Sequence, residues 1–420
     1  MNVFKFGGTS VNSVERIKNV AGILKNYPGE KLLIVISAMG KTTNALEKVV
    51  DTFFAGKKEE ALELFNGVKQ NHLTTAKYLL VTNYNESAKQ LNNFFTEAEW
   101  LLHDKPVRDY DYYYDQVVCV GELLSTAIVS AYLNEAGIKN TWMDVRDIIR
   151  TDDNFRDANI EWDITQNNIT NTILPLFNET NIVMTQGFIG STDENESTTL
   201  GREGSDYTAA VFANMLNAKS QTIWKDVVSV MNADPKEFPD AQPIHELNYD
   251  EVIEMAYYGA QVIHPKTIKP LQNKGIPLYV KCFLNPALEG TYIHDGSIKG
   301  LPPIFVIKQN QVLLHLHSQD FSFVGEKPIS RLYQILAEIK IKPNLLQSGA
   351  VSLMMCLDDR ADKIEKLAMA ASEIFDVQVE KGLILLTIRH YNKTILEEMT
   401  VGKEIVLKQQ SPETVQVLMK

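Results

Sequence analysis

A repeated pattern constrains this chain most: a short apolar run ends in glycines or hydroxyl residues, and an amphipathic stretch follows. NVFKF runs into GGTS and then into residues 13–27, where apolar side chains recur at helical spacing. KLLIVIS at 31–37, TNIVMTQGFIG at 180–190 and SQTIWK at 220–225 are further apolar runs of strand length. Alternating strands and helices predict a mainly parallel sheet covered by helices. We therefore expect an α/β domain over residues 1–300.

Residues 55–135 read as mostly helical, with an interruption at KPVRDYDYYYD, residues 105–115. This aromatic and acidic segment is interpreted as a surface loop, with a lid over a site as the alternative.

The character of the sequence changes after Pro302 and Pro303, which indicate a linker. Amphipathic stretches at 328–341 and 359–375 alternate with strand-like runs, which predicts small ferredoxin-like α+β domains. We expect a first such unit over 301–370 and a shortened second one over 371–420. No catalytic group is recognised in this part, so binding or assembly is its predicted role.

Charge and cysteine content narrow the class of protein. The net charge of −12 argues against nucleic acid and acidic membranes as partners, so an anionic ligand needs a local cluster of cations. The three cysteines are widely separated and fit neither a disulfide framework nor a zinc site, as expected in the cytoplasm. No uninterrupted apolar run approaches the length of a membrane span. We predict a soluble cytoplasmic protein.

The turn after the first strand contains residues that could bind an anion. Gly7 and Gly8 let backbone N–H groups approach a phosphate, a helix begins near Asn12, and Lys5 adds a cation with the hydroxyl of Ser10 nearby. A tight turn beside an edge-strand lysine explains the same residues equally well.

Later turns and helices add polar groups that suit a small anionic substrate. Arg202 can grip a carboxylate in bidentate fashion, although a surface salt bridge is the commoner role. Asp206 could orient Lys5 or cap its helix. Glu122 lies in an apolar helix and needs a partner, either a substrate ammonium or an internal cation.

The strand end WKDV places Lys225 and Asp226 where a nucleotide could bind, whereas His264, directly before a proline, is interpreted as structural. The Walker motif, the protein-kinase signatures and a GxGxxG after the first strand are all absent, as are GxSxG and HExxH.

Motifs in a fixed order then point to a family. KFGGTSV, VISAMGKTTN, VGELLS, TLGREGSDYTAA, VMNADPK and YYGAQVIHP closely resemble the aspartate kinases (aspartokinases) of the amino-acid-kinase superfamily. The resemblance covers about residues 1–300, and the tail resembles that family's paired ACT regulatory domains. It implies a three-layer sandwich around a mainly parallel sheet, followed by ferredoxin-like ACT domains.

The resemblance also implies a reaction and partners. Aspartokinases transfer the γ-phosphoryl group of ATP to the β-carboxylate of L-aspartate with Mg²⁺, the first step toward lysine, threonine and methionine. A homodimer or homotetramer through the ACT region and an amino-acid effector are implied as well. By position, the matching catalytic residues are Lys5 and Asp206. Those for substrate are Ser37, Thr43, Glu122, Phe188 and Arg202, and those for nucleotide are Gly7, Gly8, Ser10, Ser205, Lys225, Asp226 and Lys236. No protein side chain is predicted as a dedicated metal ligand.

Several positions depart from the family pattern. Glu203 stands where a second glycine is common in GRGGSD, and Lys225 replaces a threonine. In the tail, Asn344 and the pair Gly349-Ala350 replace the aspartate and Ser-Glu pair that usually contribute to effector binding. Three further departures in the nucleotide region are Met231 for tyrosine, Lys236 for arginine and Gln261 for lysine.

Two alternatives to an aspartate kinase stay open on the sequence. One is a kinase-like binding or regulatory protein without turnover, and the other is an amino-acid kinase acting on glutamate or N-acetylglutamate.

Overall fold

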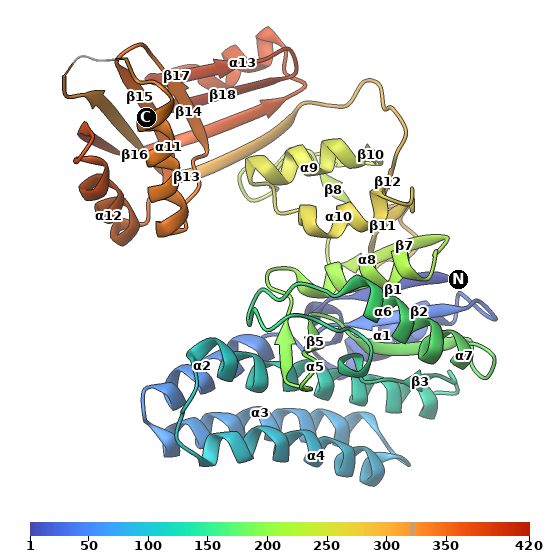
Figure 1. Ribbon diagram of the computed structural model, residues 1–420. Coiled ribbons are helices and arrows are strands. Elements are labelled where there is room, and N and C mark those ends of the chain that lie inside the picture. Colours follow the sequence, from blue (N-terminus) through green and yellow to red (C-terminus); the bar gives the residue numbers. More distant parts are fainter. Residues whose placement is uncertain (321–322) are drawn as a thin grey trace. The chain divides into compact units, whose positions relative to one another are not determined.

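The computed structural model describes residues 1–320 and 323–420, and these form two compact units, each with its own sheet (Figure 1). Unit 1 comprises Met1–Val230, Pro243–Ile253 and Val262–Ile298; unit 2 comprises Met231–Gln242, Glu254–Gln261 and Lys299–Lys420.

An eight-stranded sheet forms the centre of unit 1. In chain order its strands are β1 (Asn2–Phe6), β2 (Leu32–Ile36), β3 (Thr141–Trp142), β4 (Ile182–Gln186), β7 (Ser220–Lys225), β10 (Glu246–Asn248), β11 (Leu278–Cys282) and β12 (Thr291–His294). Their order across the sheet is β10-β12-β11-β7-β1-β2-β4-β3. The pairs β7–β1, β1–β2 and β2–β4 are parallel, and within the described part of the chain the one antiparallel pair of this sheet is β11–β12. The predicted mainly parallel sheet is confirmed.

The central strands are apolar throughout because both faces of the sheet are covered. All residues of β2 are buried, as the continuous run LLIVI predicts for a strand between two helical layers. Helix α8 (Gly204–Met215) packs on β1, β2 and β7 from one side, and α5 (Tyr110–Glu135) packs on β2, β3 and β4 from the other (Figure 1). This gives the three-layer arrangement implied by the family resemblance.

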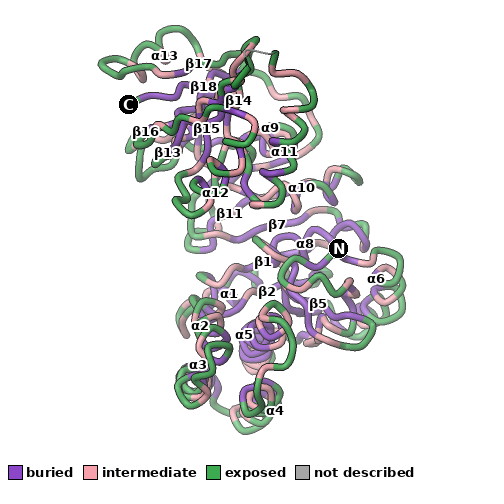
Figure 2. Tube along the Cα trace, turned by 60° about the vertical axis from the view of Figure 1, so that its left-hand side comes forward, coloured by how far each residue is buried: buried purple, intermediate pink, exposed green. Residues whose placement is uncertain are grey.

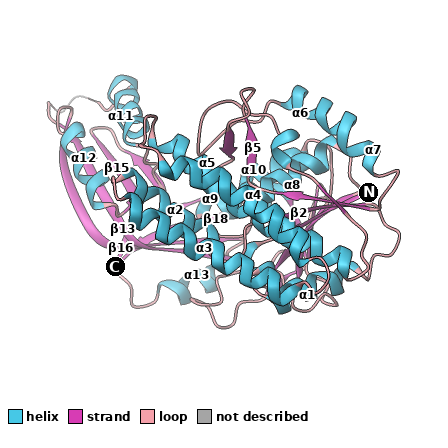
Figure 3. Cartoon of the chain, turned by 90° about the horizontal axis from the view of Figure 1, so that it is seen from below, coloured by secondary structure: helices cyan, strands magenta, loops and turns pink. Residues whose placement is uncertain are grey.

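Further helices surround this core. Helices α3 (Lys58–Leu79) and α4 (Tyr84–His103) lie side by side, and α4 packs on α5 (Figure 3). The other elements of this part of the chain are η1 (Gly8–Val11), α1 (Val14–Leu24), α2 (Thr42–Phe54), η2 (Val145–Asp147), α6 (Trp162–Asn168), η3 (Ile169–Ile173), α7 (Leu174–Leu176), β5 (Ile189–Ser191), β6 (Ser197–Thr199), β8 (Val230–Met231), β9 (Pro243–Ile244), α9 (Tyr249–Tyr258) and α10 (Pro265–Gln272).

Helix α5 is long and apolar enough to span a membrane by length and composition, but 83% of its apolar window is buried inside the fold (Figure 2). Every residue from Val117 to Ser130 is buried, as in the core helix of a folded domain.

Two local predictions need correction. The segment 105–115 is a loop only up to Asp109; from Tyr110 it forms the first turns of α5, because Tyr110 and Tyr113 pack against Phe54 of α2. The helix after the first glycine turn is capped by Ser13, whose hydroxyl accepts from the Arg16 N–H, so it starts one residue later than expected.

Unit 2 is built on an antiparallel sheet in the order β14-β15-β13-β16-β18-β17. Its strands are β13 (Ile304–Ser318), β14 (Leu345–Ser348), β15 (Ser352–Asp358), β16 (Phe375–Arg389), β17 (Ile405–Gln410) and β18 (Thr414–Met419), and its helices are α11 (Glu326–Ile339), α12 (Ala361–Ala371) and α13 (Lys393–Thr400). The order β14-β15-β13-β16 with α11 and α12 is the predicted ferredoxin-like unit, since β-α-β-β-α-β is its chain order.

The second half of unit 2 is shorter. It has the eight-residue helix α13 and the strands β17 and β18, and the long strands β13 and β16 pair along both halves. The domain limits 1–300, 301–370 and 371–420 stay predictions.

Candidate functional site

Residues at the ends of four neighbouring parallel strands meet at one edge of the sheet in unit 1. Lys5 lies near the end of β1, Ser37 follows β2, Phe188 follows β4 and Lys225 ends β7. Because these strands are parallel, their carboxyl ends share one edge, where ligands of open α/β sheets bind. A cavity of about 640 Å³ opens there. Of the predicted site residues, it is lined by Lys5, Gly7, Ser37, Thr43, Glu122, Phe188, Arg202, Ser205, Asp206, Lys225 and Asp226.

A carboxylate between two lysines lines this cavity. Asp206 Oδ1 lies 2.6 Å from Lys5 Nζ, and Asp206 Oδ2 lies 3.9 Å from Lys225 Nζ. Burial opposes ionisation of Asp206, yet the Lys5 and Lys225 ammonium groups hold the pKa of its carboxyl below the ordinary value. The three charges are thus fixed in place, with one net positive charge available to an anion. Lys5 lies on a central strand, which removes the edge-strand explanation of its position.

The glycine turn after β1 leaves room for that anion. A Cβ on Gly8 would lie 2.6 Å from the Ala38 carbonyl oxygen, so only glycine allows this turn to approach the end of β2. A Cβ on Gly7 would lie 3.5 Å from Lys5 Nζ, on the cavity side. Gly8 and Ser10 do not line the cavity: Ser10 is buried beneath the turn, where its hydroxyl donates to the Trp224 carbonyl at 3.5 Å.

Glu122 is a buried carboxyl facing the cavity. Burial raises its pKa to about 8, although a hydrogen bond from the Ala38 backbone and the Lys5 charge act in the opposite direction. Within residues 1–320 and 323–420 its Oε2 atom has no hydrogen-bond partner, and the carboxyl forms no ion pair. No internal cation therefore pairs with Glu122 in the described part of the chain, so its carboxyl is open to a ligand in the cavity.

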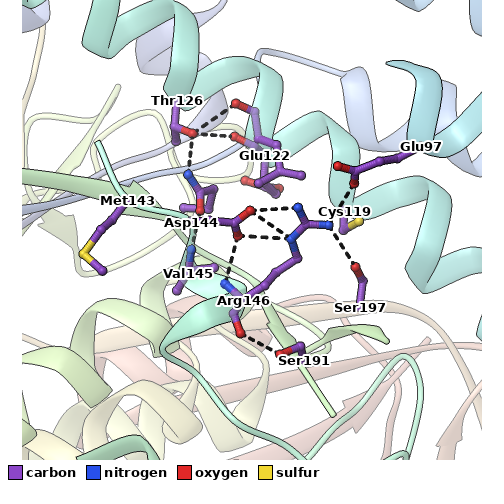
Figure 4. Close-up of polar contacts among 12 residues, drawn as sticks. Glu97, Cys119, Glu122, Thr126, Met143, Asp144, Val145, Arg146, Ser191 and Ser197 are labelled. Carbon is purple, nitrogen blue, oxygen red and sulfur yellow. Dashed lines mark hydrogen bonds and ion pairs between the residues drawn. The ribbon is translucent and has the colours of Figure 1, made fainter. Parts of the chain in front are cut away.

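A polar network behind α5 sets the position of Glu122 (Figure 4). The Thr126 hydroxyl donates to the Glu122 carbonyl at 3.0 Å and accepts from the Gln186 amide at 2.8 Å. The same Gln186 side chain accepts from the Val145 N–H at 2.7 Å. These bonds join the helix that carries Glu122 to β4 and to η2.

Arg146 strengthens this junction. Its guanidinium lies 2.7 Å from Asp144 and 3.1 Å from Glu97, and it donates to the Ser197 hydroxyl at 3.4 Å (Figure 4). One side chain thereby connects η2, α4 and β6.

Arg202 precedes α8 and is exposed at the cavity. It forms no ion pair in the described part of the chain, so the salt bridge expected for a surface arginine is not present. Asp206 likewise does not cap α8, because its carboxylate faces Lys5. The structure gives His264 a structural contact: its Nδ1 accepts from the Lys266 N–H at the start of α10. Lys236 belongs to unit 2 and is not among the residues that line this cavity.

The cavity is also lined by residues that the sequence did not predict, notably Tyr114, Arg156 and Thr199. Arg156 has a φ of 70°, a left-handed conformation that non-glycine residues rarely adopt. Its guanidinium pairs with Asp111 at 3.0 Å and lies 4.4 Å from the Tyr114 ring centre. The local sequence NFRDAN does not predict this position, because the loop that contains Arg156 is held by α5, which lies earlier in the chain.

Asp115 is the residue that holds it. Its buried carboxyl accepts from the Arg156 N–H at 2.9 Å, from the Thr199 N–H at 2.8 Å and from the Thr199 hydroxyl at 2.7 Å. Burial raises its pKa to about 7 against these three donors. Asp115 thus fixes two walls of the cavity without lining it.

We expect Asp115→Ala to lower the free energy of unfolding by about 2–3 kcal/mol, since buried donors are left without an acceptor. Asp115→Asn keeps an acceptor and should stay close to wild type at neutral pH. The pKa is higher in the folded chain than in the unfolded one, so the wild-type contribution to stability falls as pH rises from about 4 to about 7. Urea unfolding at pH 5 and pH 8 checks this: Asp115→Asn should lose that part of the pH dependence, and an unchanged slope would contradict it.

Comparison with known proteins identifies the family. The model of the amino acid kinase family matches residues 1–282. The lysine-sensitive aspartokinase 3 of Escherichia coli is 32% identical over 414 residues, which cover 96% of this chain and 89% of that protein. The chain belongs to the aspartokinase family. The chloroplastic aspartokinase 2 of Arabidopsis thaliana is 34% identical over 85% of this chain, which spans 66% of that longer protein.

Solved aspartokinase structures agree over the full length of the chain. E. coli aspartokinase III in complex with aspartate and ADP, described as an R-state, matches with a TM-score of 0.83 at 28% identity, covering 100% of this chain and 96% of the other. The same enzyme with lysine and aspartate, described as a T-state, matches with a TM-score of 0.82 at 28% identity and covers 95% of that chain. This aspartokinase is therefore a kinase whose fold matches that of E. coli aspartokinase III.

Proposed function

We propose that this aspartokinase transfers the γ-phosphoryl group of ATP to the β-carboxylate of L-aspartate and forms 4-phospho-L-aspartate. One observation carries the proposal: the paired charges of Lys5, Asp206 and Lys225 line the same cavity as Glu122 and Arg202. The E. coli relative crystallised with aspartate and ADP supports the two substrates.

The acceptor half of the cavity matches the charges of an amino acid. Glu122 lacks a cationic partner, so a substrate ammonium completes it, and the exposed Arg202 guanidinium suits a carboxylate. Ser37, Thr43 and Phe188 complete this wall. An N-acetylated acid has no ammonium to offer Glu122, which disfavours N-acetylglutamate as the acceptor.

The donor half suits phosphate groups. Lys5 and Lys225 supply positive charge, and Gly7, Ser205 and Asp226 also line the cavity, with Ser205 in the first turn of α8, where backbone N–H groups favour an anion. Gly8 and Ser10 shape the turn from behind. Lys236 stays a sequence-based nucleotide assignment.

Phosphoryl transfer from this arrangement needs positioning and charge stabilisation more than proton transfer. A carboxylate oxygen is already nucleophilic at neutral pH, so no general base is required. In this proposal Lys5 stabilises negative charge on the phosphoryl group as it moves, and the ion pair with Asp206 holds the Lys5 ammonium in position.

The residues present fit Mg²⁺ that arrives with the nucleotide. Among the residues the structure describes, no group of three or more carboxylate, histidine or cysteine side chains could hold a metal ion. Mg²⁺ usually binds through substrate phosphates, waters and one or two carboxylates, and Asp206 and Asp226 are two of the carboxylates that line this cavity. When bound, the ion neutralises phosphate charge.

Unit 2 is proposed to serve regulation and assembly, as a homodimer or homotetramer with an amino-acid effector. The T-state structure of the relative with lysine supports an effector of this class. In this chain Asn344 is already engaged: it accepts from Lys308 at 2.7 Å and donates to Gln311 at 2.7 Å and Asp358 at 2.8 Å. The unpaired buried cysteines Cys119, Cys282 and Cys356 agree with the proposed cytoplasmic location.

The direct test is formation of aspartyl hydroxamate from L-aspartate, ATP, Mg²⁺ and hydroxylamine by the purified full-length chain. We expect product from L-aspartate, and none from N-acetyl-L-aspartate or in the absence of ATP. Product from L-glutamate at an equal or higher rate would favour the alternative acceptor, and nucleotide binding without any product would favour a binding protein.

A further inference from the structure

The segment Val262–Lys266 is fastened to the wall of the cavity at several points; we call it the strap. Lys225 Nζ donates to the Val262 carbonyl at 2.6 Å, and Glu203 Oε2 accepts from the His264 N–H at 2.9 Å. At its far end, Lys266 Nζ donates to the Leu200 carbonyl at 3.1 Å. The strap does not itself line the cavity, but Glu203 and Lys225 do.

Glu203 keeps its position at a conformational cost. Its φ of 53° and ψ of 28° are left-handed, a conformation that glycine adopts freely and that costs other residues about 1 kcal/mol or more. Its carboxylate does not cap α8, although it directly precedes that helix. A glutamate at this position therefore has a strained backbone conformation, but its carboxylate accepts the hydrogen bond that holds the strap.

Lys225 is shared between two acceptors. Its ammonium lies 2.6 Å from the Val262 carbonyl but 3.9 Å from Asp206, whose other oxygen holds Lys5 at 2.6 Å. Without the strap carbonyl, the Lys225 ammonium would have Asp206 as its nearest anion and would compete with Lys5 for it. The strap therefore keeps Lys225 off Asp206 and preserves the Lys5–Asp206 pair.

We propose that Glu203 and Lys225 act as one device, in which the strap, anchored by Glu203, holds the Lys225 ammonium in place beside the phosphate site. Both are positioning residues in this role. The expected effects on kcat/KM rest on the proposed function. The new element is that the strap, which is distant from Glu203 and Lys225 in the sequence, couples these two side chains.

A double-mutant cycle tests the coupling. Glu203→Gly and Lys225→Thr should each lower kcat/KM for ATP about tenfold, as expected for losing one hydrogen bond to a charged group. The double variant should lose no more than Lys225→Thr alone, about tenfold, because the strap has no ammonium left to hold once Lys225 is replaced. Glu203→Gln keeps an acceptor for the His264 N–H and should stay within about threefold of wild type. Losses that multiply to about a hundredfold would overturn the proposal.

A second readout does not depend on turnover. Hydrogen exchange of the peptide that covers the strap should speed up in Glu203→Gly and in Lys225→Thr, but not in Glu203→Gln. The thermal midpoint of Glu203→Gly should not fall, because glycine relieves the left-handed strain. If wild type does not phosphorylate aspartate, the proposed function fails. The coupling can still be decided from hydrogen exchange and from the ADP affinities of wild type, the two single variants and the double variant. Unchanged exchange in Glu203→Gly would overturn it.

Discussion

Lys5→Met is expected to lower kcat by about a thousandfold, while the protein stays folded. Removing a cation that stabilises a phosphoryl group in transit costs about 10³-fold or more in comparable enzymes. Methionine keeps much of the volume and the apolar stem of the lysine, which is buried among the strands. The measurement is steady-state hydroxamate formation at saturating ATP and aspartate.

Lys18→Ala is the matched control, because Lys18 is an exposed lysine of α1, outside the cavity. It should leave kcat within about twofold of wild type, as is usual for surface substitutions. Full activity in Lys5→Met would remove the catalytic assignment without touching the fold.

The second large effect concerns Glu122. Glu122→Gln is expected to lower kcat/KM for aspartate by about a hundredfold, because the substrate ammonium then meets a neutral amide in a buried site. The loss should fall mainly on KM for aspartate and leave KM for ATP within about threefold. Equal losses for both substrates would indicate a general disturbance of the cavity instead.

The pH profile gives the Glu122 assignment a sharper form. With a pKa of about 8 the carboxyl of the free enzyme is largely protonated at pH 7 and cannot attract an ammonium ion. Binding of aspartate then requires loss of that proton, so kcat/KM for aspartate should rise as pH goes from about 7 to about 9. In Glu122→Gln this limb should be absent.

Much of this site follows from the sequence because parallel strands end at one edge. Lys5, Ser37 and Lys225 each stand at or next to a strand end in the sequence, and the strand order β7-β1-β2-β4 brings them together. Glu122 was recognisable as a carboxylate in an apolar helix, a combination that needs a partner.

The rest depends on tertiary contacts that no local pattern encodes. Arg156 reaches the cavity because Asp115 of α5 holds its backbone in a left-handed conformation. Glu203 could be recognised from the sequence only as an unexpected charge, since its acceptor role requires His264, 61 residues further along the chain. The positions of Arg156 and Glu203 depend on loop conformation and on long-range hydrogen bonds, and the periodicity of a sequence predicts neither of these.

The most direct test of the central claim compares hydroxamate formation by wild type, Lys5→Met and Glu122→Gln in one experiment, with L-aspartate and N-acetyl-L-aspartate as acceptors. The account predicts ATP-dependent product from wild type with L-aspartate alone, about a thousandfold less at saturation with Lys5→Met, and a loss with Glu122→Gln that appears at low aspartate. Product from N-acetyl-L-aspartate at the rate of L-aspartate, or no product from either, would contradict it.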